Sequence, residues 1–340
     1  MMHRALACAA LAMFACQLVV PAASAQERPS MKPAIVLAAF GTTDVEAVDS
    51  ILNIEKRVKA AFPDYDVRLA FTSNIIRGIW HKRANDADFK KENPGVSEEI
   101  YAIKNPLTVL ANIQEEGARP VLVQSLHVTD GDEYKDLAEL VKTLASYKTQ
   151  KRSHFAPFAW IAVGNPALGV GDGQPKYLDR AVEALAPLAR KAWESESALV
   201  LMGHGNEHLT QEVFAKLEDA LRKKYGPQVY IGTVEAPPFA EDIVESIGKS
   251  EKPPRSVLLA PLMVVAGDHA RNDMAGDEED SWASIFKANG FAVDTHLIGL
   301  GSNDSWADIY VEHLKVIEPA VKEKQAKDKA EKAKEKEEGE

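Results

Sequence analysis

Two histidines and a glutamate lie close together in the stretch LVLMGHGNEHLT, which begins at Leu199. They form the pattern H-x-x-E-H, in which two histidines on one helical face hold zinc and the glutamate transfers protons. A protease site of this kind requires His204 and His208 to lie one turn apart on a helix. Gly203 and Gly205 flank His204, and glycine is the most helix-averse residue after proline. The flanking residues therefore disfavour the protease reading.

The residues around this motif favour a strand followed by a turn. ALVLM, immediately before it, is a β-type apolar run, and helical periodicity begins only with Val213, Leu217 and Leu221. His204 is therefore predicted to project from a strand-to-helix turn at the carboxyl edge of a sheet. His208 is predicted to lie in or near the start of the helix and to point elsewhere.

Two further residues that bind metals or protons follow predicted strands. His269 comes after LMVV in a Gly-Asp-His turn, and Glu235 follows the strand-like run QVYIGTV. Taken singly, each of these residues also fits a hydrogen-bonded turn. Three strand ends that deliver His204, Glu235 and His269 to one edge instead predict a metal site with imidazole and carboxylate ligands.

The elements that must position these residues alternate between strand and helix. AIVLAAF begins at Ala34, and apolar residues then recur at helical spacing, at Val45, Val48, Leu52 and Val58. Further strand-like runs are DVRLAF, RPVLVQSL, FAWIAV, ALVLM, QVYIGTV, RSVLLAPL and FAVDTHLIGL. Near-continuous apolar strands separated by helices predict an α/β protein with parallel sheets covered on both faces.

The two halves of the chain resemble each other. RPVLVQSLHVTDGDEY from Arg119 matches RSVLLAPLMVVAGDHA from Arg255, and IVLAAFGTT from Ile35 matches LVLMGHGNE from Leu199. The second match sets Phe40-Gly41-Thr42 opposite the tripeptide that begins with His204. The repeat predicts two similar Rossmann-like lobes with a cleft between them, where ligands of such sheets bind.

The same patterns give a domain organisation. We expect a signal peptide at 1–25, an N-terminal lobe at 32–165, a crossover segment at 166–196 and a C-terminal lobe at 197–318. The remaining residues, 319–340, alternate Lys and Glu and form a charged tail, which fits a solvated helix or a disordered end.

The first residues have the features of a secretory leader. Arg4 precedes an apolar run, and Ala-Ser-Ala offers a cleavage site after Ala25. The sequence therefore predicts a periplasmic protein released from its leader. The only two cysteines, Cys8 and Cys16, lie inside that leader. Because the mature chain would carry no thiol, its metal ligands would be imidazole, carboxylate or backbone oxygen. Lipid attachment at Cys16 is an alternative that the residues before it disfavour.

Charge and hydropathy exclude several classes of partner. The formal net charge is −11, whereas nucleic acids and anionic membranes select clustered lysine and arginine. No apolar stretch after the leader approaches the roughly 20 residues of a membrane-spanning helix. We therefore expect no nucleic-acid partner and no membrane anchor.

Five motifs together resemble one family. They are AAFGTTD, TSNIIR, VQSLHVTDGDEY, MGHGNEH and AGDHARNDMAGD, which occur in this order between Lys32 and Glu318. In this order they are similar to the anaerobic cobalt chelatases, the sirohydrochlorin cobaltochelatases of the class II chelatase superfamily, which also contains ferrochelatases. The leader departs from the usual cytoplasmic enzyme, although the family has periplasmic members.

The resemblance implies a function and a set of ligands. It implies insertion of Co²⁺, or alternatively Fe²⁺, into the tetrapyrrole sirohydrochlorin without a nucleotide, and assembly as a homo-oligomer. It also implies metal binding by His204 and His269, with Glu235 as the acidic partner. A non-catalytic periplasmic carrier of tetrapyrrole or metal, built on the same fold, is the alternative.

Other residues are secondary candidates for substrate binding. Gly41, Thr42 and Thr43 follow the first strand, where backbone N–H groups can hold a carboxylate of the tetrapyrrole. An ordinary tight turn explains them equally well. Glu133 takes the place in the first lobe that His269 takes in the second, and is either a second acid facing the cleft or a solvated residue. For His127, just before it, a core or turn role is favoured over ligation.

The polar segment 79–103 is longer than the other connections. It is predicted to be a flap over the ligand or an assembly contact. His81 lies beside Trp80 in this segment and suggests an axial ligand of haem, but an ordinary exposed loop histidine is the favoured interpretation.

Overall fold

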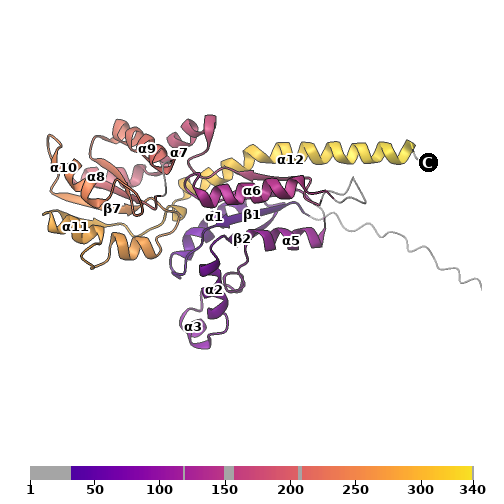
Figure 1. Cartoon of the computed structure of the whole chain (residues 1–340), viewed down its shortest axis with the longest axis horizontal. Helices are drawn as coiled ribbons and strands as arrows, with labels where there is room; N and C mark the ends of the chain where they lie inside the picture. The colour runs from indigo at the N-terminus through magenta and orange to yellow at the C-terminus, as the bar shows by residue number, and fades with distance from the viewer. Residues whose placement is uncertain (1–31, 118, 149–156, 206–208, 339–340) are drawn as a thin grey trace, which may run out of the picture. The chain divides into compact units, whose positions relative to one another are not determined.

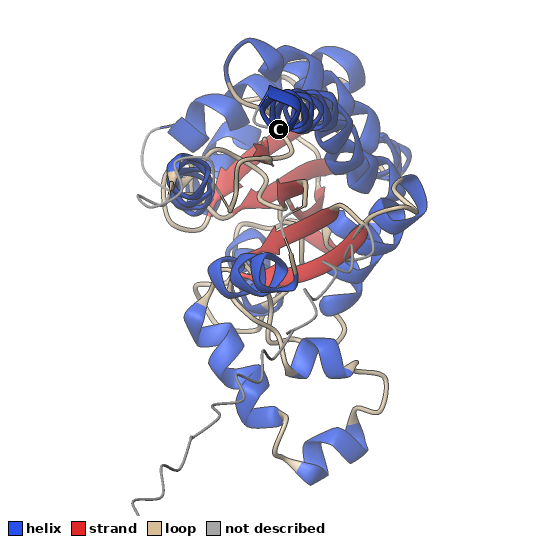
Figure 2. Cartoon of the chain, turned by 90° about the vertical axis from the view of Figure 1, so that its right-hand side faces the viewer, coloured by secondary structure: helices blue, strands red, loops and turns tan. Residues whose placement is uncertain are grey.

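The computed structural model describes residues 32–117, 119–148, 157–205 and 209–338, and contains two parallel four-stranded sheets. Helices cover the faces of both sheets (Figures 1 and 2). The first sheet has the order β2-β1-β3-β4, and its strands are β1 (Ala34–Ala39), β2 (Asp66–Phe71), β3 (Val121–Ser125) and β4 (Ile161–Gly164). The second has the order β6-β5-β7-β8, with β5 (Ala198–Gly203), β6 (Val229–Thr233), β7 (Ser256–Pro261) and β8 (Ala292–Thr295).

The two sheets have the same topology, as the internal repeat predicts. In each sheet the first strand in sequence pairs with the second on one side and with the third on the other, and all pairs are parallel. The fold class predicted from the sequence, an α/β protein with two similar parallel-sheet lobes, is confirmed.

The central strands are buried on both faces, which explains their continuous apolar runs. All six residues of β1 and all six of β5 are buried. Because side chains alternate along a strand, Ile35 and Leu37 lie on one face of β1, whereas Ala34 and Val36 lie on the other. Leu199 of β5 belongs to the same hydrophobic cluster as Ile35 and Leu37, so this core is continuous between the lobes.

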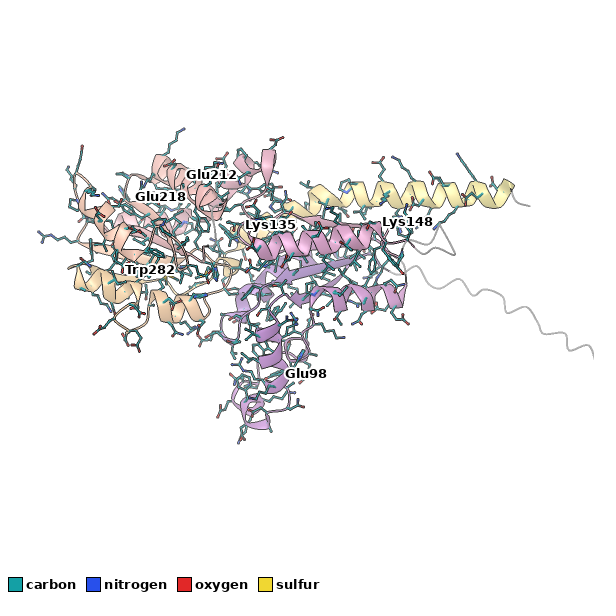
Figure 3. The ribbon with its side chains drawn as sticks, viewed as in Figure 1. Glu98, Lys135, Lys148, Glu212, Glu218 and Trp282 are labelled. Atoms are coloured by element: carbon teal, nitrogen blue, oxygen red, sulfur yellow. The ribbon has the colours of Figure 1, made fainter. Side chains whose placement is uncertain are left out.

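Helices of the first lobe follow the strands at the expected places. They are α1 (Val48–Ala61), α2 (Asn74–Arg83), α3 (Ala87–Glu92), α4 (Glu98–Tyr101), α5 (Pro106–Glu116) and α6 (Asp132–Ser146). The second half of α2, together with α3 and α4, lies in the segment 79–103. In Figures 1 and 2 α2 and α3 lie to one side of the sheets, and Figure 3 labels Glu98 in the same segment.

The helical character of this segment corrects the interpretation of His81. That histidine lies on α2 rather than in a loop, and its Nε2 is 2.6 Å from the carbonyl oxygen of Ile103. Trp80 beside it is fully buried and donates its indole N–H to the carbonyl of Thr42, at 2.8 Å. Side-chain caps at Ser73, Asp86 and Ser97 start the three helices and explain why a polar sequence forms them.

The second lobe has a corresponding set of helices. These are α7 (Gln174–Ala184), α8 (Ala186–Glu194), α9 (Leu209–Tyr225), α10 (Ala240–Gly248) and α11 (Trp282–Ala288). Short turns complete it, the 3₁₀ turns η1 (Gly171–Gly173) and η3 (Leu300–Ser302) and the π-helical turn η2 (Ala270–Met274). Trp282 begins α11 and is labelled in Figure 3.

The last helix, α12 (Asp304–Glu338), returns to the first lobe. It packs against α1, α7, β3 and β4 and runs alongside the first lobe (Figure 1). Trp306, Tyr310 and Leu314 recur every fourth residue and are fully buried, so they form the packed stripe of this helix. Arg57 of α1 pairs with Asp308 of α12 through two hydrogen bonds. The start of α12 lies in the range predicted for the C-terminal lobe, but the helix stabilises the first sheet. The predicted boundaries stay predictions.

The predicted leader and the predicted cleavage site after Ala25 lie outside the described residues. Within the part of the chain that the structure describes, no helix is both long enough and apolar enough to cross a membrane.

A buried histidine on α12 predicts a pH dependence of stability. His313 is 2% exposed, stacks on Tyr177 with ring centroids 3.8 Å apart, and burial lowers its pKa to about 4. In the unfolded chain the pKa returns to about 6.5. As the pH falls from about 6.5 to 4, the unfolded chain takes up a proton that the folded chain does not, so the free energy of unfolding should decrease.

Denaturant unfolding of the wild-type protein and of His313→Gln at pH 7, 5.5 and 4.5 measures this effect. The variant has no imidazole to protonate, so its free energy of unfolding should decline less steeply. Equal pH slopes for the two proteins would show that His313 is not responsible.

Candidate metal site

Three side chains predicted to bind metal lie together in the structure. His204 follows β5, Glu235 follows β6 and His269 comes eight residues after β7. His204 Nε2 is 3.6 Å from Glu235 Oε1, and the rings of His204 and His269 meet edge to face with centroids 4.9 Å apart. All three side chains are between 38% and 51% exposed, so solvent and a substrate can reach them. The prediction that three strand ends converge is therefore confirmed as geometry, while their role as ligands stays a prediction.

The backbone fixes His204 and Glu235 relative to each other. The carbonyl oxygen of His204 accepts hydrogen bonds from the amides of Val234 and Glu235, at 3.1 and 3.0 Å. Gly205 has a φ of +83°, a left-handed conformation that favours glycine. A Cβ at Gly205 would lie 2.5 Å from Thr233 Oγ1, so no larger residue fits without a shift. The glycine that argues against a protease helix thus lets the turn after β5 approach β6.

Hydrogen bonds determine which nitrogen of each imidazole faces a metal. His204 Nδ1 is 2.8 Å from the carbonyl oxygen of Gly205, which only accepts, so Nδ1 carries the proton. His269 Nδ1 is 2.5 Å from the carboxylate of Asp273 and is protonated for the same reason. In the neutral tautomer that these hydrogen bonds favour, Nε2 is the nitrogen available to a divalent metal.

Asp273 is a residue that the sequence analysis missed. It lies four residues after His269, within the π-helical turn η2, and this spacing places its carboxylate on the same side as the imidazole. A His-x-x-x-Asp pattern in the segment that follows a strand is the signal that could have identified it. Carboxylate partners of this kind orient metal-binding histidines and increase their basicity.

The first lobe touches the turn that carries His269. Gly267 packs against Thr42, since a Cβ on Gly267 would lie 3.0 Å from Thr42 Oγ1. Arg271 pairs with Asp44 through Nε, at 2.7 Å, and with Glu46 through a terminal nitrogen, at 2.8 Å. The contact of Nε with Asp44 is an ion pair rather than a well-directed hydrogen bond. The turn after β1 therefore lies directly beside the candidate metal site.

The residues predicted to bind substrate carboxylates occupy this turn. Gly41 has a φ of +102° and Thr42 is buried, with its hydroxyl accepting from the amide of Asp44 at 3.1 Å. The carbonyl of Thr43 accepts from the guanidinium of Arg83 at 2.5 Å. Helix α1 starts at Val48, so the turn does not open directly into a helix N-terminus. Carboxylate binding by Gly41, Thr42 and Thr43 stays a prediction.

Glu133 and His127 lie at the corresponding edge of the first sheet. Glu133 is half-buried in the first turn of α6, and His127 follows β3. Ser125 Oγ is 2.8 Å from His127 Nδ1, while Nε2 is buried without a hydrogen-bond partner among the described residues. Burial lowers the pKa of His127 to about 4, so the ring is neutral. Glu133 as a substrate-binding residue stays a prediction.

His204, Glu235 and His269 do not surround a common metal position in this structure. Within residues 32–117, 119–148, 157–205 and 209–338, no group of three or more His, Cys, Asp or Glu side chains is positioned to hold a metal ion. Binding of one ion by all three side chains therefore requires a change in their positions. His208 lies outside the described residues.

Comparison with known proteins decides the family. Residues 33–318 match the cobalt chelatase family, CbiK. The chain belongs to the cobalt chelatase family. Sirohydrochlorin cobaltochelatase of Salmonella typhimurium is 30% identical over 296 residues, which cover 86% of this chain and 99% of that protein. Sirohydrochlorin cobaltochelatase CbiKC of Nitratidesulfovibrio vulgaris is 32% identical over 289 residues, covering 85% of this chain and 92% of that protein.

A solved structure supports the fold of this metal chelatase. SirB from Bacillus subtilis, determined with Fe³⁺, superposes with a TM-score of 0.53 at 12% sequence identity, covering 84% of this chain and 96% of SirB. At this identity the comparison shows the fold alone. The resemblance to the cobalt chelatases inferred from five motifs is confirmed by the family match.

Removal of the carboxylate beside His269 should weaken metal binding in this chelatase. In Asp273→Asn the side chain keeps its shape and its amide oxygen can still accept from Nδ1–H, but the negative charge that increases the basicity of Nε2 is lost. We expect Co²⁺ affinity to fall by roughly 10- to 100-fold, the usual cost of losing such a partner. Isothermal titration calorimetry with Co²⁺ measures it. Asp268→Asn, an exposed aspartate on the same turn whose carboxylate pairs with Asn272, is the matched control. Equal affinities for both variants would exclude this role of the carboxylate.

Proposed function

We propose that this chelatase inserts Co²⁺, or alternatively Fe²⁺, into sirohydrochlorin without ATP. The observation that carries the proposal is the pair of imidazoles, His204 and His269, which lie beside Glu235 and use Nδ1 in hydrogen bonds, so that Nε2 is the nitrogen available to a metal. The names of the two relatives at 30% and 32% identity support the choice of substrate. The sequence has no Walker-type glycine loop, so nothing in it calls for a nucleotide.

The chemistry matches the groups present. Insertion converts a hydrated divalent ion and a free-base tetrapyrrole into the metallated ring, water and two protons. The neutral imidazoles of His204 and His269 hold the ion with few ligands, so positions stay open for pyrrole nitrogens. Glu235 reduces the net charge of the ion, and its carboxylate can accept a proton released from the ring. Because the ligands are half-exposed, the ion can exchange with solvent.

A turnover assay tests the proposal against the alternative of a carrier. Purified protein is mixed with sirohydrochlorin and Co²⁺, and the absorbance shift of metallation is followed against a protein-free control. We expect acceleration by the wild-type chain, loss of acceleration in the His204→Ala, His269→Ala double variant, and little change in His208→Ala. A wild-type rate equal to the protein-free rate would refute catalysis of metal insertion and leave the non-catalytic carrier as the remaining alternative.

We also propose that the protein works in the periplasm after removal of residues 1–25. The leader pattern of Arg4, an apolar run and Ala-Ser-Ala supports this location. Intact mass spectrometry of the protein purified from its native host should give a chain that begins at Gln26. A mass that retains Met1, or that carries lipid on Cys16, would contradict the proposal.

A further inference from the structure

An aromatic side chain stands exposed where the first sheet ends. Phe40 directly follows the fully buried strand β1 and is 47% exposed. Single exposed apolar residues are common and need no explanation. Phe40 differs because of its position in the repeat, the rigidity of its turn, and a second exposed apolar residue on the segment that its carbonyl contacts.

The internal repeat places Phe40 in the first lobe where His204 lies in the second. Both residues directly follow the first strand of their sheet, and both precede a glycine with positive φ, at +102° for Gly41 and +83° for Gly205. Since the two sheets have equivalent strand orders, Phe40 and His204 occupy equivalent positions at the carboxyl edges of the first and second sheets. One lobe carries a metal ligand there and the other an apolar ring.

The turn that carries Phe40 is fixed on both sides. The carbonyl of Phe40 accepts from the amide of Ser73, at 3.3 Å, and a Cβ on Gly41 would lie 2.6 Å from the ring of Phe71. Two residues after Phe40, Thr42 packs against Gly267, which itself lies two residues before His269. The exposed ring is thus held close to the candidate metal site, on the opposite lobe.

Ile75 is an exposed apolar residue on the segment that contacts the carbonyl of Phe40. It lies in the first turn of α2, two residues after Ser73, and is 76% exposed. A tetrapyrrole presents a flat unsaturated face, and aromatic rings bind such faces by stacking. The apolar ring and the metal ligands are in separate lobes, so one face of a macrocycle can rest on the first lobe while the metal approaches from the second.

We infer that Phe40, supported by Ile75, is the platform on which the tetrapyrrole ring stacks. This inference rests on the proposed function and makes Phe40 a substrate-positioning residue. A platform binds the ring equally before and during metal insertion, so its loss raises KM and leaves kcat nearly unchanged. Metal binding, which belongs to the other lobe, is unaffected.

The test compares Phe40→Ala, Phe40→Trp and Tyr147→Ala with the wild-type protein. Tyr147 is an aromatic residue of similar exposure, 55%, at the far end of α6 from the carboxyl edge. Sirohydrochlorin titrations followed by absorbance give its Kd, the insertion assay gives KM and kcat, and calorimetry gives Co²⁺ affinity.

We expect Phe40→Ala to raise the Kd and KM for sirohydrochlorin roughly tenfold, corresponding to the loss of one aromatic contact. Phe40→Trp should restore binding, and Tyr147→Ala should behave as wild type. Co²⁺ affinity should be the same in all four proteins. Unchanged sirohydrochlorin binding in Phe40→Ala, or equal losses of sirohydrochlorin and Co²⁺ affinity, would overturn the inference alone. Failure of the wild-type protein to bind sirohydrochlorin would overturn the proposed function and this inference with it.

Discussion

The turn after β1 packs against the turn that carries His269, and this contact ties the position of His269 to the first lobe. Thr42 packs against Gly267, and Arg271 pairs with Asp44 and Glu46 of the opposite lobe. Arg271 is partly exposed, so each ion pair contributes about 0–1 kcal/mol to stability. Their importance lies in their position, because Arg271 lies two residues after His269, within the turn η2. A shift of this contact would move His269 relative to the other two candidate ligands, His204 and Glu235.

The core explains how such a weak contact can hold its place. The hydrophobic cluster between the lobes includes Leu37 of β1 and Leu201 of β5, and α12 carries Trp306 and Tyr310 from the end of the chain back onto the first lobe. The continuous core holds the two lobes together, so the ion pairs of Arg271 serve only to orient the turn that carries His269. Half-exposed candidate ligands at the edge of a rigid core are accessible to a metal ion and are held in fixed positions.

The sequence predicted the fold well because its strands are unusually clear. Buried apolar runs such as those from Ala34 and Ala198 have few alternatives, and the repeat revealed the second sheet from the first. Two features escaped prediction for physical reasons. Helix α12 packs on the first lobe, which ends more than a hundred residues before it in the sequence. The spacing of its apolar residues predicts a buried helix face but not the element on which that face packs. Residues 79–103 form helices through side-chain caps, which are weak signals in a polar sequence.

The site was only partly predictable for a similar reason. His204, Glu235 and His269 follow strands, so their common edge could be inferred from topology. Asp273 depends on a local π-helical turn, which periodicity does not reveal. The exposure of Phe40 and the packing of Gly41 against Phe71 are tertiary features, which the sequence pattern does not reveal. The positions of strand ends therefore predict which candidate ligands lie together. The residues that orient these ligands, such as Asp273, can be identified only from the structure.

The central claim is that one divalent ion binds to His204 and His269 through nitrogen, with Glu235 as a third ligand. X-ray absorption spectroscopy of the protein loaded with one equivalent of Co²⁺ tests it most directly, since scattering from imidazole rings is distinct from that of oxygen ligands. The account predicts two imidazole ligands together with carboxylate or water oxygens. A coordination shell made of oxygen alone would contradict it.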